Sequence, residues 1–191
     1  MNKKKDEELM MESKFGNREA LEVIFHRYKV LLFNYAFRII GNRADAEDVV
    51  SDIFLVLSSP KTIYTPKAKF STWLYTVAHN ACISRIRKRK KLVYMWFKRK
   101  GDDTYTELDI PSGQNPVSLN TEDKNVISQI KGAIKKLPLE QREAIILRVY
   151  QNLSYAEISE ALGYSMSKVK VLIFRAREKL RRELLPSIRR I

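Results

Sequence analysis

A short helix, a glycine turn and a second, basic helix are encoded between Leu153 and Leu180. Ser154 is the predicted N-cap of the first helix, and Glu157 three residues later completes an S-x-x-E capping box. Gly163 lies where a residue in the left-handed conformation would end that helix. The pattern predicts a helix-turn-helix, a form whose second helix places side chains in the DNA major groove.

The second predicted helix, residues 167–180, has two different faces when its side chains are spaced at about 100°. Its apolar side carries Val169, Ile173, Ala176 and Leu180. Val171 and Phe174 point outward, where they can pack against thymine methyl groups, and the neighbouring cations can reach phosphates or guanine. The alternative is an ordinary amphipathic helix with a solvated basic face. The outward side carries Ser167, Lys168, Lys170, Val171, Phe174, Arg175, Arg177 and Lys179.

The positive charge of the chain is concentrated in two blocks. Its 191 residues carry a formal net charge of +14. Residues 1–91 have a net charge of +8, residues 92–120 of −1 and residues 121–191 of +7. Two basic blocks around a nearly neutral connector suggest a polyanion bound at two places, with an affinity that falls steeply with salt. A membrane surface would also attract this charge, but two separate basic blocks fit it less well.

Helical periodicity runs through nearly the whole chain, which predicts an all-α fold. The polar segment 101–121 contains both glycine and proline and is typical of a linker. We therefore expect two small helical domains, residues 1–95 and 122–191, joined by a flexible linker over 96–121, with the helix-turn-helix in the C-terminal domain. Helices are expected over 18–40, 44–57, 71–91, 122–136, 139–150, 154–162 and 167–183.

Several classes of protein are disfavoured by composition. Cys82 is the only cysteine, so an internal disulfide and a thiolate zinc site are excluded. The lysines at the start are not followed by an apolar run, which argues against a signal peptide. The apolar stretch 30–40 contains Asn34 and Arg38 and is too short to span a bilayer. We expect a soluble, cytoplasmic protein with no membrane insertion, no metal and no cofactor.

Three aspartates form an acidic stripe on the predicted helix 44–57. Asp45, Asp48 and Asp52 lie within about 60° of one another, with Leu55 at the edge of the stripe. The stripe fits a docking patch for a basic partner protein, to which the leucine would add apolar area. It also fits a Mg²⁺ site for phosphodiester chemistry, although no second carboxylate motif or histidine pair accompanies it. The third alternative is a solvated face.

The predicted helix 71–91 carries a polar stripe beside a run of positive charge. Amide, hydroxyl and guanidinium groups on one face suit contacts with bases and phosphates. Six of the seven residues 85–91 are cations, which repel one another unless a polyanion neutralises them; a solvated face is the alternative. Trp73 is expected in the core, whereas Phe70 and Tyr75 could be core residues or stacking platforms. The stripe comprises Thr76, Asn80, Ser84 and Arg87, which lie within about 80°.

These motifs, in this order, resemble the extracytoplasmic-function branch of the sigma-70 family, bacterial RNA polymerase initiation factors. The resemblance covers nearly the whole chain. DAEDVVSDIFLVL, residues 45–57, is similar to the polymerase-binding segment of the family. FSTWLYTVAHNACISRIRK, residues 70–88, is similar to the helix that recognises and opens the −10 promoter element. Residues 137–180 resemble the domain that binds the −35 element.

The resemblance implies a function and assigns residues to it. The chain would bind core RNA polymerase and promoter DNA and direct DNA opening and initiation, without enzymatic activity of its own, and an anti-sigma factor would be a further partner. The domain 1–95 would correspond to sigma region 2 and the domain 122–191 to region 4. The implied polymerase contacts are Asp45, Glu47, Asp48, Asp52 and Leu55. The implied −10 DNA contacts are Lys67, Lys69, Phe70, Thr76, Asn80, Ser84, Arg87 and Lys88. The implied −35 DNA contacts are Ser167, Lys168, Lys170, Val171, Arg175 and Arg177.

The chain departs from the family pattern at two places, and two rival functions stay open at this stage. Ser84 stands where the family usually has aspartate, and Val171–Leu172 stand where Ser-Arg is common, which removes a basic contact. No −35 consensus is therefore carried over. The first rival is a conventional helix-turn-helix regulator that binds duplex operators without polymerase. The second is a metal-dependent nuclease using Asp45, Asp48 and Asp52.

Overall fold

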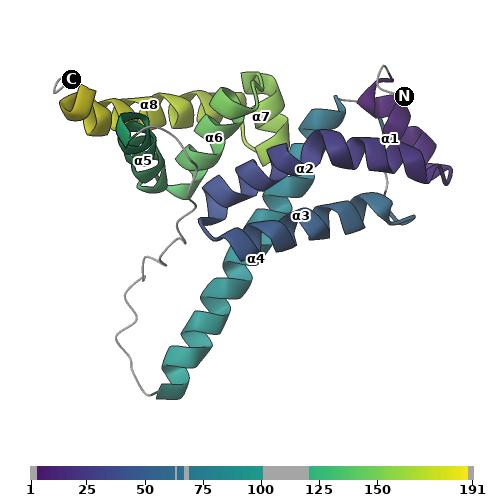
Figure 1. The fold of residues 1–191 in the computed structure, drawn as a ribbon, viewed down its shortest axis with the longest axis horizontal. Coiled ribbons are helices and arrows are strands. Elements are labelled where there is room, and N and C mark those ends of the chain that lie inside the picture. The colour runs from purple at the N-terminus through teal and green to yellow at the C-terminus, as the bar shows by residue number, and fades with distance from the viewer. Residues whose placement is uncertain (1–3, 63, 67–68, 101–120, 189–191) are drawn as a thin grey trace. The chain divides into compact units, whose positions relative to one another are not determined.

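Every regular element that the structure describes is an α-helix, which confirms the all-α prediction (Figure 1). The computed structural model describes residues 4–62, 64–66, 69–100 and 121–188. The chain forms two compact units. The first holds α1 to α3 and α4 from Val77 onward, and the second holds α5 to α8 together with Pro66–Thr76. Most of the predicted linker, residues 101–120, lies outside the described residues.

The first unit is organised around its longest complete helix, α2 (Arg18–Ile40), which packs against α1 (Asp6–Lys14) and α3 (Arg43–Ser58). The Asn17 side chain caps α2 by accepting a hydrogen bond from the backbone N–H of Ala20 at 3.2 Å. Gly41 ends α2 with a left-handed φ of 76°, and Asn42 next to it caps α3. The sharp turn between α2 and α3 therefore follows from two adjacent residues.

Helix α1 was not predicted from the sequence, because its nine residues show little apolar periodicity. Leu9 and Met10 are nevertheless fully buried. Asp6 at the beginning of α1 accepts a hydrogen bond from the Tyr28 hydroxyl at 2.6 Å. Lys14 at its end donates to the carbonyl oxygens of Leu57 at 2.9 Å and of Ser59, and burial lowers the pKa of this lysine. The helix is thus held by its tertiary contacts with α2 and α3.

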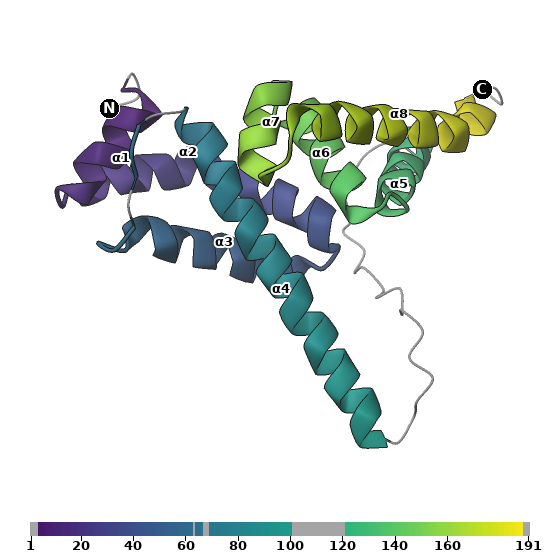
Figure 2. The same ribbon diagram turned by 180° about the vertical axis from the view of Figure 1, so that it is seen from behind.

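Helix α4 (Phe70–Lys100) lies across α2 and α3 in Figure 2. It continues to Lys100, so the first five residues of the predicted linker 96–121 are helical. The reason is local: the segment after residue 91 contains no glycine or proline before Gly101. The first unit buries an apolar core whose fully buried side chains include Ile24, Leu32, Tyr35, Ala46, Ile53, Ala78 and Cys82.

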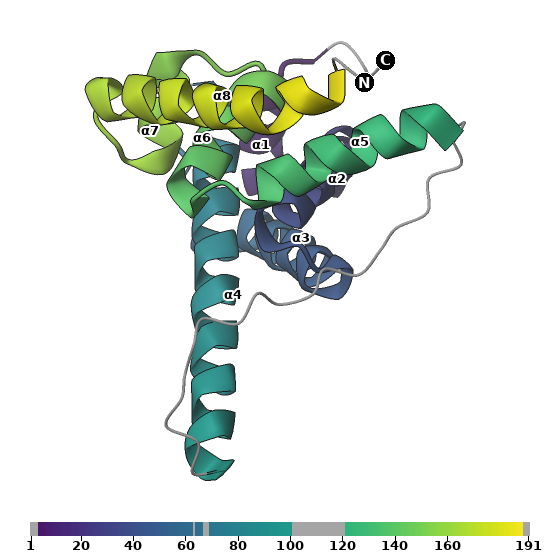
Figure 3. The same ribbon diagram turned by 90° about the vertical axis from the view of Figure 1, so that its left-hand side faces the viewer.

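In the second unit, α8 (Met166–Ile188) packs against α5 (Thr121–Lys135), α6 (Leu139–Tyr150) and α7 (Tyr155–Leu162) (Figure 3). Helix α8 begins one residue earlier and ends five residues later than the predicted helix 167–183. None of the helices, within the residues described, contains a stretch apolar and long enough to cross a membrane. The core of this unit includes Leu137, Ile146, Leu147, Ile158, Ala161, Val169, Ile173 and Ala176.

Two glycines should respond oppositely to alanine. Gly163 has a φ of +67°, and a Cβ there would meet no atom within 4 Å, so Gly163→Ala introduces backbone strain without a clash. We expect the free energy of unfolding to fall by about 1–2 kcal/mol. Gly132 is helical with equally open surroundings, so Gly132→Ala should raise that free energy by about 0.5–1 kcal/mol. Urea denaturation measures both, and shifts of the same sign would contradict this account.

Candidate functional site

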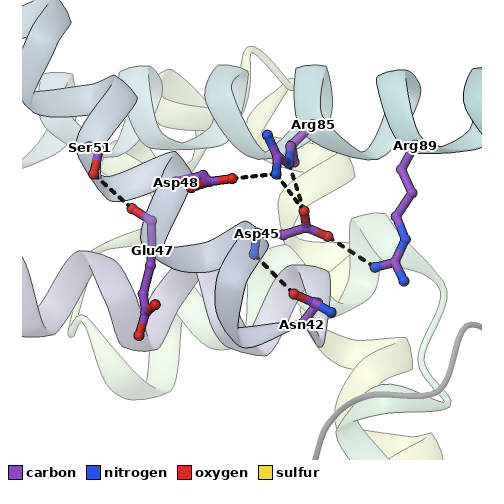
Figure 4. Close-up of polar contacts among 7 residues, drawn as sticks. All are labelled: Asn42, Asp45, Glu47, Asp48, Ser51, Arg85 and Arg89. Carbon is purple, nitrogen blue, oxygen red and sulfur yellow. Dashed lines mark hydrogen bonds and ion pairs between the residues drawn. The ribbon is translucent and has the colours of Figure 1, made fainter.

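Two aspartates near the beginning of α3 are bonded to two arginines of α4 (Figure 4). Arg85 donates from Nε to Asp45 Oδ1 at 2.8 Å and from Nη2 to Asp48 Oδ2 at 2.5 Å. Arg89 donates from Nη1 to the other Asp45 oxygen at 3.0 Å. Asp45 thus bridges two guanidinium groups, while Asp48 binds one. We call these four residues the α3–α4 ion-pair cluster.

The aspartates of the cluster differ in exposure. The Asp45 side chain is 16% exposed, whereas that of Asp48 is 57% exposed. The pKa of Arg85 is raised, chiefly by its hydrogen bond to Asp45. Asp45 also lies in the first turn of α3, where its negative charge is favourable to the helix dipole. Asp45 therefore links α3 to α4 from a mostly covered position. Asp48 also binds Arg85, but most of its side chain is accessible to solvent.

The remaining residues of the predicted polymerase surface are exposed on α3. Glu47 forms an ion pair with Arg43, one turn away, at 2.8 Å. Asp52 is exposed, and 66% of Leu55 is accessible. Glu47, Asp48, Asp52 and Leu55 are thus all exposed on α3.

The arginine partners of the acidic stripe were not predicted from the sequence. The predicted alternatives for the cations 85–91 were an external polyanion and a solvated face, whereas Asp45 and Asp48 neutralise part of that run from within the chain. A signal was present in the spacing. Arg85 and Arg89 continue the side of α4 that buries Ala78 and Cys82, at intervals of three and four residues.

The opposite side of α4 presents the predicted −10 residues. Thr76 is half-buried, and its hydroxyl donates to the carbonyl oxygen of Thr72 at 3.2 Å. Lys69 is exposed, and Lys67 lies outside the described residues. The exposed members of this face are Asn80, Ser84, Arg87 and Lys88.

For Phe70 and Tyr75 at the beginning of α4, the sequence allowed either a core role or a stacking role. Phe70 is fully buried, with its ring centroid 5.8 Å from that of half-buried Trp73. Tyr75 is 2% exposed, and burial raises the pKa of its hydroxyl. The structure therefore places Phe70 and Tyr75 in the core. A ring buried in this way has no free face on which a base can stack.

The helix-turn-helix has the local geometry predicted for it. Ser154 Oγ accepts from the Glu157 backbone N–H at 3.2 Å, and the Glu157 carboxylate accepts from the Ser154 backbone N–H at 2.7 Å. Gly163 adopts the left-handed conformation. Across the turn, the Ser159 hydroxyl donates to the Tyr164 carbonyl oxygen. These contacts fix the angle at which α8 leaves α7.

The two faces of α8 also match the sequence prediction. Val169, Ile173 and Ala176 are at most 1% exposed, whereas Leu180 is half-buried. Phe174, 66% exposed, adds an apolar group beside the cations of the outward face. That face exposes Ser167, Lys170, Val171, Arg175 and Arg177.

Lys168 differs from the other predicted −35 residues because it already has partners. Its Nζ lies 2.7 Å from Glu140 Oε1 of α6 and 3.8 Å from the centroid of the Tyr164 ring. The hydrogen bond from Lys168 lowers the pKa of Glu140, and burial is the main cause that raises the pKa of Tyr164 to about 12. Lys168 is thus held in place at the beginning of α8.

The metal interpretation of the acidic stripe finds no support in this geometry. The oxygens of Asp45 point to guanidinium groups, which take the place that a cation would need. Within the described part of the chain, no group of three His, Cys, Asp or Glu side chains is placed to hold a metal ion.

Comparison with known proteins gives matches along most of the chain. Residues 24–92 match the family described as Sigma-70 region 2, and residues 127–180 match Sigma-70, region 4. The ECF RNA polymerase sigma factor SigW of Bacillus subtilis is 34% identical over 175 residues, covering 90% of this chain and 92% of that protein. The RNA polymerase sigma factor YlaC of the same organism is 29% identical, covering 90% of this chain and 95% of its own length.

Solved structures show the same fold. The sigma factor RpoE of Bartonella quintana, in complex with the anti-sigma factor NepR, has a TM-score of 0.65 at 24% identity and covers 85% of this chain and 95% of its own. CnrH, in complex with the cytosolic domain of CnrY, has a TM-score of 0.67 at 22% identity, and the match covers 95% of this chain and 97% of CnrH. With a relative of 34% identity matched along nearly its full length, the chain belongs to the extracytoplasmic-function sigma factors of the sigma-70 family.

Proposed function

We propose that this chain is a dissociable initiation factor that binds core RNA polymerase through α3 and promoter DNA through α4 and α8. The observation that carries the proposal is the separation of an exposed acidic surface on α3 from exposed basic faces on α4 and α8. On this account the protein supplies binding energy and no catalytic group. It would act in the cytoplasm, where bacterial polymerase and DNA meet.

The polymerase-binding surface comprises Glu47, Asp48, Asp52 and Leu55. Its carboxylates suit a basic partner, because complementary charge speeds encounter and fixes the register of docking. Leu55, 66% exposed, supplies apolar area at its end. Asp45 belongs to the site as a positioning residue, since most of its side chain is covered and both of its oxygens are bonded to α4.

Two DNA-binding faces complete the proposal. On α4, the amide, hydroxyl and cationic groups of Asn80, Ser84, Arg87 and Lys88 would contact the −10 element. Opening would be driven by capture of unstacked bases, whose extraction costs a few kcal/mol. On α8, the exposed cations around Val171 and Phe174 would read the −35 element in the major groove. Lys168 fits a phosphate contact, because its position is already restricted by Glu140 and Tyr164.

An anti-sigma factor is the further partner that we propose. RpoE, which shares the fold, is described in complex with the anti-sigma factor NepR, and CnrH is described in complex with the cytosolic domain of CnrY. The support within this chain is exposed apolar area on α3, where Val56 joins Leu55. A protein that covered this area would compete with polymerase for α3.

Reversing one charge on α3 tests the polymerase surface. Asp52→Arg places a cation where we expect a basic partner, and like charges at an interface are strongly unfavourable. We expect the affinity for core polymerase to fall by at least about tenfold, with helicity by circular dichroism unchanged. Glu19→Arg is the matched control, because it reverses an exposed charge on α2 outside the proposed surface. Wild-type affinity of Asp52→Arg in a quantitative pull-down would refute the assignment.

Removing one cation from α8 tests the −35 surface. Arg175→Ala should weaken binding to a duplex selected by the protein from a random library by roughly 1–3 kcal/mol if the arginine contacts a base. Arg181→Ala removes an exposed arginine of the same helix outside the proposed surface and should have a smaller effect. Fluorescence anisotropy over a range of salt concentrations separates the contacts. A salt slope reduced by about one unit, with unchanged sequence preference, would identify a phosphate contact instead.

A further inference from the structure

The cations that follow Ser84 on α4 divide into two sets. At about 100° per residue, Arg87 and Lys88 fall on the side of Asn80 and Ser84, whereas Arg85 and Arg89 fall on the side that buries Ala78 and Cys82. Figure 4 shows the second pair directed at the beginning of α3. The basic run is therefore only partly available to nucleic acid in the free protein.

The bonds formed by Arg85 occupy the part of the guanidinium group that best binds a phosphate. Its Nε and Nη2 atoms donate to Asp45 and Asp48, and this is an edge that can form two parallel hydrogen bonds with an oxyanion. The side chain of Arg85 is still 32% exposed. Arg85 thus lies at the surface of α4 with a bidentate edge already taken by carboxylates.

The two aspartates hold Arg85 unequally. Asp45 is shielded and uses both oxygens within the cluster, whereas Asp48 is 57% exposed and belongs to the proposed polymerase surface. An exposed ion pair is worth little and is readily exchanged for another partner. A cation of a docked protein can therefore compete with Arg85 for Asp48 at small cost. Arg85 is then held by Asp45 alone, whose Oδ1 lies 2.7 Å from Nη2, and one N–H group of Nη2 loses its acceptor.

We propose that Arg85 is a further phosphate-binding residue of α4, that Asp48 occupies its Nη2 group in the free protein, and that polymerase bound at Asp48 frees this group for a DNA phosphate. This inference deepens the proposed function and rests on it for the identity of the partner. Because binding free energies are linked, DNA bound to Arg85 also makes Asp48 more available and strengthens polymerase binding by the same factor. Docking and promoter binding are then coupled through one side chain.

DNA titrations of variants of the whole chain, carried out without polymerase, test whether Asp48 keeps Arg85 from binding DNA. The probe is a fluorescent 20-nucleotide single strand of mixed sequence, titrated at several salt concentrations. Asp48→Asn should tighten binding by about threefold to tenfold and raise the salt slope by about 0.7, the value for one more phosphate contact on single-stranded DNA. Glu19→Gln, which removes an exposed charge of α2, controls for the change in net charge and should have a smaller effect.

A double-mutant cycle identifies Arg85 as the group that responds. Arg85→Gln should weaken DNA binding clearly in the Asp48→Asn background and only slightly in the wild type. The proposal is overturned if Arg85→Gln has the same effect in both backgrounds, or if Asp48→Asn and Glu19→Gln tighten binding equally. Thermal unfolding by circular dichroism confirms that each variant is folded, and Asp48→Ser provides a second way to remove the carboxylate.

Repeating the titration with core polymerase separates this inference from the proposed function. Arg85→Gln should weaken DNA binding more in the polymerase complex than in the free protein. If the protein fails to bind polymerase, the proposed function is wrong while the result of the cycle still stands. If it binds polymerase and Arg85→Gln has equal effects in both states, the coupling is wrong while the proposed function stands.

Discussion

The carboxylate of Asp45 is the contact on which the arrangement of α3 and α4 depends most directly. Its two oxygens bind guanidinium groups that lie one turn apart on α4, so the rotation of α4 about its own axis is restricted. With that rotation set, Arg85 and Arg89 face α3, and Asn80, Ser84 and Arg87 face outward. A single partly buried acidic residue thus helps to determine which side of a strongly basic helix faces outward.

The proposed function requires a chain of net charge +14 to keep its acidic α3 surface from being covered by its own cations. The α3–α4 ion-pair cluster confines the contact between cations and carboxylates to the beginning of α3. Arg85 and Arg89 are committed to Asp45 and Asp48 near the beginning of α3, and the exposed Asp52 and Leu55 lie further along the helix. In the second unit, Glu140 similarly engages one cation of α8, Lys168, and leaves Arg175 and Arg177 exposed. Both basic helices therefore offer selected cations rather than all of them.

The helix-turn-helix was predictable because its signals are local. The capping box of Ser154 and Glu157, the left-handed Gly163 and the apolar side of α8 each depend on residues close in sequence. Helix α1 was not predictable in this way, since it is fixed by distant partners such as Tyr28 and the end of α3. The same holds for the pairing of Asp45 with Arg85, 40 residues apart, which requires knowing how α3 and α4 cross. Sequence patterns predicted that both charged faces exist, and only tertiary structure revealed that part of one neutralises part of the other.

The central claim is that these surfaces act together on one transcribing enzyme. The most direct test is reconstituted transcription of a fragmented genomic library by core polymerase from the protein's own source, with and without the purified protein, followed by mapping of transcript 5′ ends. The account predicts a new set of discrete start sites that appears only when the protein is present and shares upstream sequence at two positions. The same start sites at the same frequency in both reactions would contradict it.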